Sequence, residues 1–108
     1  MDFEILVAFF DSMKNILKRP IIAEIVDKSD DHISRMLIIF TNGYSLSIIH
    51  GSGTYSDSQE GLFEIAPYNN DGKMDGSLFD KKDIGDDVLG YCDIEKIKHY
   101  VNKLGNLK

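Results

Sequence analysis

The dipeptide Asn42-Gly43 constrains the fold more than any other feature of this sequence, because it lies between two runs that are typical of β-strands. Residues 33–41 before it are rich in large apolar and β-branched side chains, and residues 44–48 after it alternate between apolar residues and serine. Asn-Gly accommodates the positive φ values of a type I′ turn, which joins two antiparallel strands through a two-residue loop. The sequence therefore predicts a β-hairpin here, and with it an antiparallel sheet.

Further strands are predicted on both sides of this hairpin. Residues 21–27 are apolar and β-branched, and a polar cluster separates them from residues 33–41, so these two segments are expected to pair. Residues 36–40 are apolar on both alternating faces, which is typical of a central strand covered on both sides. Residues 62–66 form the next predicted strand, and Pro67 indicates a sheet edge or a strand end, because proline lacks the N–H that a ladder uses.

The stretch from residue 73 to residue 90 is rich in loop-forming residues. Asn70-Asp71-Gly72 before it is typical of a chain reversal. Within it, Ser77-Leu78-Phe79 is the segment that can add a short fifth strand to the sheet.

Helical patterns occur near both ends of the chain. Residues 3–18 carry apolar side chains at three- and four-residue steps, with Asp2 placed to cap the N-terminus. Residues 94–104 repeat this pattern behind Asp93, which is a second N-cap candidate. The predicted fold is thus α+β: an antiparallel sheet of four or five strands, with an N-terminal and a C-terminal helix packed on it, in a single domain over residues 1–108.

The expected compartment is the cytoplasm. Asp2 and Glu4 occupy the place where a secretory signal needs a basic region. The longest early apolar run, residues 5–10, is far shorter than the about 20 residues that a membrane span requires, so no membrane association is expected. Cys92 is the only cysteine, which excludes a disulfide framework and fits a reducing environment.

Acidic residues are concentrated in one part of the chain. Residues 57–93 contain ten acidic and three basic residues, whereas the rest of the chain is nearly balanced and the total net charge is −6. A field of this sign repels phosphate backbones and attracts cationic surfaces, so we expect a basic protein as partner and no direct binding of nucleic acid. The alternative is that these carboxylates only keep a small protein soluble.

No pattern of catalytic or metal-binding residues is found. The three histidines, His32, His50 and His99, have no second ligand at a spacing typical of metal motifs. A calcium loop beginning at Asp71 fails, because Lys73 stands where a carboxylate ligand is needed. Cys92 is expected to be a small buried apolar residue. We therefore predict neither enzymatic activity nor a cofactor or metal.

A series of turn and strand motifs resembles a group of known proteins. In chain order, the motifs are Asn-Gly-Tyr-Ser-Leu-Ser-Ile at 42–48, Gly-Leu-Phe-Glu-Ile-Ala at 61–66, Asp-Gly at 71–72 and Asp-Asp-Val-Leu-Gly-Tyr at 86–91. Over residues 42–104 this arrangement resembles small proteins of unassigned function that bacteriophages and prophages encode. The resemblance implies the fold of that segment and a phage source, and it assigns no site residue.

Charge and source together lead to a functional expectation, which is a phage-type inhibitor acting in the host bacterial cell. Its clustered carboxylates would occupy a basic groove that normally holds a phosphate backbone, in a host defence or nucleic-acid-handling protein such as a CRISPR effector. Aromatic side chains would serve as anchors at the centre of the contact. The expected partner-binding residues are Asp80, Asp83, Asp86, Asp87, Tyr55, Phe79 and Glu60.

Two other functions stay open at this point. In the first, the domain binds a small ligand, and the glycine-bounded loop at residues 51–61 closes over it as a lid. In the second, the protein is an accessory or structural oligomer, with a homodimer formed through the apolar side of the predicted N-terminal helix.

Overall fold

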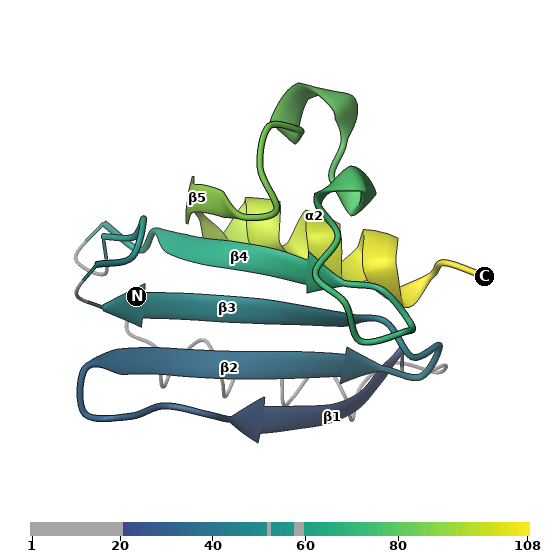
Figure 1. Cartoon of the computed structure of the whole chain (residues 1–108), viewed down its shortest axis with the longest axis horizontal. Coiled ribbons are helices and arrows are strands. Elements are labelled where there is room, and N and C mark those ends of the chain that lie inside the picture. Colours follow the sequence, from purple (N-terminus) through teal and green to yellow (C-terminus); the bar gives the residue numbers. More distant parts are fainter. Residues whose placement is uncertain (1–20, 52, 58–59) are drawn as a thin grey trace.

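The protein is described here by a computed structural model, which describes residues 21–51, 53–57 and 60–108. These residues form a five-stranded antiparallel sheet in which each strand pairs with the next along the chain (Figure 1). Two short 3-10 helices and one α-helix follow the fourth strand and flank the fifth. The elements are β1 (Ile22–Asp27), β2 (Ile33–Phe40), β3 (Ser45–Gly51), β4 (Phe63–Tyr68), η1 (Gly76–Leu78), η2 (Lys81–Asp83), β5 (Leu89–Cys92) and α2 (Ile94–Gly105).

The predicted hairpin at Asn42-Gly43 is confirmed, since β2 and β3 pair in antiparallel register on either side of it. The predicted turn type is wrong. Gly43 has a φ of +90°, but Tyr91 is the only non-glycine residue of the described chain with a positive φ, so Asn42 does not adopt the type I′ conformation. The Gly43 N–H instead bonds to the Phe40 carbonyl at 3.1 Å, which gives a three-residue loop with glycine in the left-handed position.

One face of the sheet forms the hydrophobic core with α2. Met36, Ile38 and Phe40 of β2 point to this face and are buried, whereas Leu37 and Ile39 between them point to the opposite face and are only partly covered. β2 is an interior strand, as predicted, but its two faces are not covered equally. The buried apolar residues of the core are Ile22, Met36, Ile38, Phe40, Leu46, Ile48, Phe63, Ile65, Phe79, Cys92, Ile97, Tyr100, Val101 and Leu104.

Helix α2 lies against the core face of the sheet (Figure 1). The predicted N-cap is confirmed, because the Asp93 carboxylate accepts a hydrogen bond of 2.9 Å from the Lys96 N–H. At the other end, the Asn42 amide donates to the carbonyl oxygens of Leu104 and Leu107, both at 2.8 Å. The hairpin turn thus holds the C-terminal end of the helix. No helix among the described residues has the length and apolar character needed to span a membrane.

The predicted architecture of two helices on the sheet needs correction. The part of the chain that the structure describes has one α-helix, α2, packed on a five-stranded antiparallel sheet. The N-terminal helix predicted at residues 3–18 lies outside the described residues, and so does the dimer surface assigned to it.

Two local predictions for the segment after β4 are also wrong. In place of the expected strand at 77–79, Gly76–Leu78 form the 3-10 helix η1, because the Asp75 carboxylate accepts the Ser77 N–H at 3.0 Å and starts a helical turn. The expected loop up to residue 90 contains the beginning of β5.

Pro67 lies within β4, which is an interior strand between β3 and β5. Because β5 pairs only with Phe63 and Ile65, Pro67 is paired with a strand on one side only, that of β3.

Candidate functional site: an aromatic and acidic edge at strand β5

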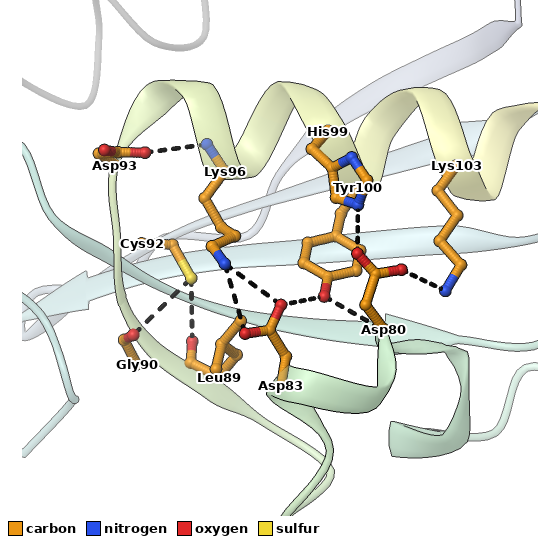
Figure 2. A network of polar contacts seen from close by, with 10 residues as sticks. All are labelled: Asp80, Asp83, Leu89, Gly90, Cys92, Asp93, Lys96, His99, Tyr100 and Lys103. Carbon is orange, nitrogen blue, oxygen red and sulfur yellow. Dashed lines mark hydrogen bonds and ion pairs between the residues drawn. The ribbon is translucent and has the colours of Figure 1, made fainter.

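Two of the predicted partner-binding residues, Asp80 and Asp83, form ion pairs with α2 (Figure 2). The Asp80 carboxylate lies 2.9 Å from the Lys103 ammonium and 2.6 Å from the His99 ring nitrogen. The Asp83 carboxylate lies 3.2 Å from the Lys96 ammonium and accepts a hydrogen bond from the buried Tyr100 hydroxyl. Both aspartates therefore attach the segment around η2 to the helix, and their charge is largely compensated within the molecule.

The titration of these groups reflects the same pairing. Hydrogen bonds from Lys103 and then from His99 lower the pKa of the Asp80 carboxyl. Burial acts against ionisation of Asp83, but hydrogen bonds from Tyr100 and Lys96 outweigh it, so the pKa of the Asp83 carboxyl also lies below its ordinary value. Burial and the adjacent Asp83 raise the pKa of the Tyr100 hydroxyl. At neutral pH the carboxylates are ionised and the phenol is a hydrogen-bond donor, which is the arrangement of a structural clamp.

Phe79 does not form a surface anchor as predicted. Its side chain is only 2% exposed, and its ring meets the Tyr100 ring edge to face at 5.2 Å between centroids. Phe79 is therefore part of the hydrophobic core. The prediction failed because Phe79 lies in a stretch that reads as loop, where nothing in the local pattern shows that the chain folds back onto a helix.

Tyr55 is exposed, as an anchor requires, and the structure places a second exposed tyrosine beside it. The side chains of Tyr55 and Tyr91 are 58% and 57% exposed, and the Tyr91 N–H donates a hydrogen bond of 2.8 Å to the Tyr55 carbonyl. The Tyr55 N–H donates in turn to the Glu64 carboxylate at 3.2 Å. The segment 53–57 is thus attached to strand β5. The sequence analysis missed Tyr91, because it falls at the end of a predicted loop.

A β-bulge directs Tyr91 outward. Leu89 and Cys92 of β5 pair with Ile65 and Phe63 of β4, so four residues of β5 lie opposite three of β4. Tyr91 takes up the extra length with a φ of +53°. A bulky residue in this conformation is uncommon and costs about 1 kcal/mol or more. Bulges often re-aim a side chain near functional sites, and this one combines backbone strain with an exposed aromatic ring.

Gly90 allows the two segments to come together. A Cβ at position 90 would lie 2.5 Å from the Tyr55 Cβ, which is shorter than any real contact.

The next residue after the bulge, Cys92, is buried, and its burial raises the pKa of the thiol to about 12. The thiol is therefore no nucleophile at neutral pH. The bulge thus exposes an aromatic side chain and no reactive group.

Exposed acidic residues occur in the same chain segments as the two tyrosines. Asp86 and Asp87 are exposed in the turn that leads into β5, where the Asp87 carboxylate accepts the Gly76 N–H at 3.0 Å. Glu60 is exposed on the hairpin that contains Tyr55, and its N–H bonds to the Asp57 carboxylate at 3.3 Å. None of the four ion pairs among the described residues includes Glu60, Asp86 or Asp87. We call the set formed by Tyr55, Glu60, Asp86, Asp87 and Tyr91 the β5 edge.

The β5 edge presents carboxylates and phenol rings to the solvent. Among the described residues, no group of three or more His, Cys, Asp or Glu side chains is placed to hold a metal ion. Carboxylates without a cationic partner and exposed phenol rings are suited to contact a cationic surface. No protein-family model matches this chain, and neither a curated protein nor a solved structure matches it.

Proposed function

We propose that this protein binds a basic surface of another protein through the β5 edge. The observation that carries the proposal is a pair of exposed tyrosines. Tyr91 lies on the bulged strand β5, and its N–H donates a hydrogen bond to the carbonyl of Tyr55. Tyrosine is enriched at the energetic centres of protein interfaces, because it offers a large, rigid surface and a polar tip. The backbone strain at Tyr91 adds support, because residues in such conformations cluster at binding and active sites.

We propose further that the partner is a host defence or nucleic-acid-handling protein, and that this protein inhibits it in the host cell. One observation supports this, which is the excess of acidic residues over residues 57–93. The resemblance of the turn and strand motifs to phage-encoded proteins stays a prediction. Carboxylates placed in a basic groove would exclude the phosphate backbone that the groove normally binds. Because Asp80 and Asp83 are paired with α2, this role falls to Glu60, Asp86 and Asp87.

The first experiment is capture of partners from bacterial lysate by the wild-type chain and by two variants of equal charge change. Glu60→Lys/Asp86→Lys reverses two carboxylates of the β5 edge and preserves the bond between Asp87 and Gly76. Asp31→Lys/Asp71→Lys reverses two exposed carboxylates elsewhere. We expect one basic protein to be captured by the wild type and by the second variant, and to be lost from the first variant and in high salt.

Inhibition is tested with that captured protein after purification. The wild-type chain should displace a labelled nucleic acid from it, with an inhibition constant equal to the dissociation constant measured for the two proteins. The Glu60→Lys/Asp86→Lys variant should fail to displace it. Equal capture by both charge-reversed variants, or binding that leaves the nucleic acid in place, would contradict inhibition through this edge.

A further inference from the structure

A second feature lies on the sheet face opposite the core and shares no residue with the β5 edge. It is a cavity of about 300 Å³, and its lining is partly cationic in a chain of net charge −6. The pleat explains its position: Leu46 and Ile48 point into the core, so Ser45 and Ser47 between them point to the opposite face. The described residues that line it are Lys28, Arg35, Leu37, Ser45, Ser47, Tyr68 and Gly72.

The hairpin between β1 and β2 places the two cations opposite each other. The Lys28 N–H donates to the Arg35 carbonyl at 2.8 Å, and the Arg35 N–H donates to the Ser29 hydroxyl at 2.9 Å. The Asp30 carboxylate accepts the N–H groups of His32 and Ile33, both at 2.8 Å, and it attracts Arg35 electrostatically without forming an ion pair with it. No ion pair within the described chain uses the Lys28 ammonium or the Arg35 guanidinium.

Hydroxyl groups line the remainder of the cavity. Strand pairing sets Ser47 beside Leu37 and Ser45 beside Tyr68. Ser47 is only 7% exposed, yet no hydrogen bond found among the described residues uses its hydroxyl or those of Ser45 and Tyr68. Interior strands favour β-branched apolar residues at such positions, and an open sheet face needs polarity only where side chains are exposed. Because no buried side-chain oxygen or nitrogen among the described residues lacks a hydrogen-bond partner, the Ser47 hydroxyl is open to the cavity, where it can bond to a ligand.

We propose that this cavity binds a small phosphorylated molecule. Its phosphoryl group would lie between Lys28 and Arg35, because a guanidinium and an ammonium together match the charge and the oxygen geometry of a phosphate monoester. The hydroxyls of Ser45, Ser47 and Tyr68 would bond to the polar body of the ligand. The volume is at the lower end for ligand pockets, which suits a sugar phosphate. No described residue of the 51–61 loop lines the cavity, so the lid expected there is not part of this site.

The test uses ribose 5-phosphate as the probe, with ribose as its uncharged control, in calorimetric titration and thermal unfolding. We expect ribose 5-phosphate to bind and to raise the Tm, and ribose to do neither. Absence of binding by ribose 5-phosphate, or equal binding of ribose, would overturn the proposal. Neither result depends on the β5 edge, so this test is independent of the proposed partner.

Three variants locate the binding site. Lys28→Met removes an exposed cation of the cavity, and Lys81→Met removes an exposed cation remote from it. We expect Lys28→Met to weaken binding about tenfold or more, and Lys81→Met to leave it unchanged. Ser47→Ala should weaken binding while retaining the fold. Undiminished binding by both Lys28→Met and Ser47→Ala would overturn the assignment of the cavity.

Discussion

The hydroxyl of Tyr100, whose side chain is buried in the core, donates a hydrogen bond to the carboxylate of Asp83 in η2. The same oxygen accepts the Asp80 N–H at 3.1 Å. One phenol group thus joins helix α2 to both ends of η2. Because Asp80 and Asp83 also pair with Lys103 and Lys96, the acidic segment that is predicted from the sequence as rich in loops is part of the packed domain.

The first prediction concerns this phenol. Tyr100→Phe keeps the packing of the ring but removes the partner of Asp83 and of the Asp80 N–H, so we expect unfolding free energy to fall by about 1–3 kcal/mol. Urea denaturation measures the change. Tyr91→Phe removes a hydroxyl from an exposed ring and should be neutral. An unfolding free energy of Tyr100→Phe that equals the wild-type value would show that these two hydrogen bonds have no stabilising role.

A second prediction follows from the lowered pKa values of Asp80 and Asp83. In the unfolded chain an Asp carboxyl has a pKa of about 3.9. A group whose pKa is lower in the folded state contributes stability that is fully present above the unfolded value and is lost as pH falls through the folded value. Stability should therefore fall as pH decreases below about 4.

The double variant Asp80→Asn/Asp83→Asn isolates this contribution. Asp27, Asp30 and Asp75 also have lowered pKa values, through hydrogen bonds within their own loops, and they contribute equally in both proteins. Urea denaturation at a series of pH values should show a smaller acid loss of stability in the variant than in the wild type. Parallel curves would mean that the two aspartates do not titrate differently on folding.

The third prediction concerns the contact between Gly90 and Tyr55. Gly90→Ala places a methyl group 2.5 Å from the Tyr55 Cβ, so the segment 53–57 must move away from β5. We expect a loss of about 1–3 kcal/mol in unfolding free energy, faster hydrogen exchange of the Tyr91 N–H, and loss of partner capture. Gly85→Ala, where a methyl group meets nothing within 4 Å, is the matched control. Normal exchange at Tyr91 in Gly90→Ala would contradict the expected displacement.

The fourth prediction separates function from stability at Tyr91. Asparagine tolerates a positive φ better than tyrosine does, so Tyr91→Asn should keep or raise the unfolding free energy, by up to about 1 kcal/mol, while partner capture is lost. Ile84→Asn removes another exposed apolar side chain, 52% exposed at a φ of −70°, and should change neither property. Retained capture by Tyr91→Asn would remove Tyr91 from the proposed interface.

Local signals in the sequence were sufficient for the elements that local chemistry determines. Asn42-Gly43 marked the hairpin, and Asp93 marked the start of α2, because turns and caps depend on a few adjacent residues. The turn type was predicted wrongly because the Asn42 amide bonds to the carbonyl oxygens of Leu104 and Leu107, 62 and 65 residues further along the chain. The residues of the turn itself contain no signal of such a distant contact.

The candidate site was less predictable for the same reason. Asp80 and Asp83 looked like free carboxylates, but their cations come from α2, 13 to 23 residues further along the chain. Tyr91 was missed because its exposure results from a bulge. The bulge depends on the register between β4 and β5 and on the close approach of Tyr55 to Gly90. Tyr55, Glu60, Asp86 and Asp87 could be selected from composition alone, since they are exposed residues in polar segments.

The bulge at Tyr91 also determines how another molecule can approach this side of the sheet. An edge strand with free, evenly spaced N–H and carbonyl groups is a template on which a strand of another chain can extend the sheet. β5 has four residues, its regular spacing is interrupted, and the Tyr91 N–H is already bonded to Tyr55. Main-chain pairing is therefore blocked on this side. Any molecule that docks here must recognise side chains, and the sheet is protected from growth by aggregation at β5.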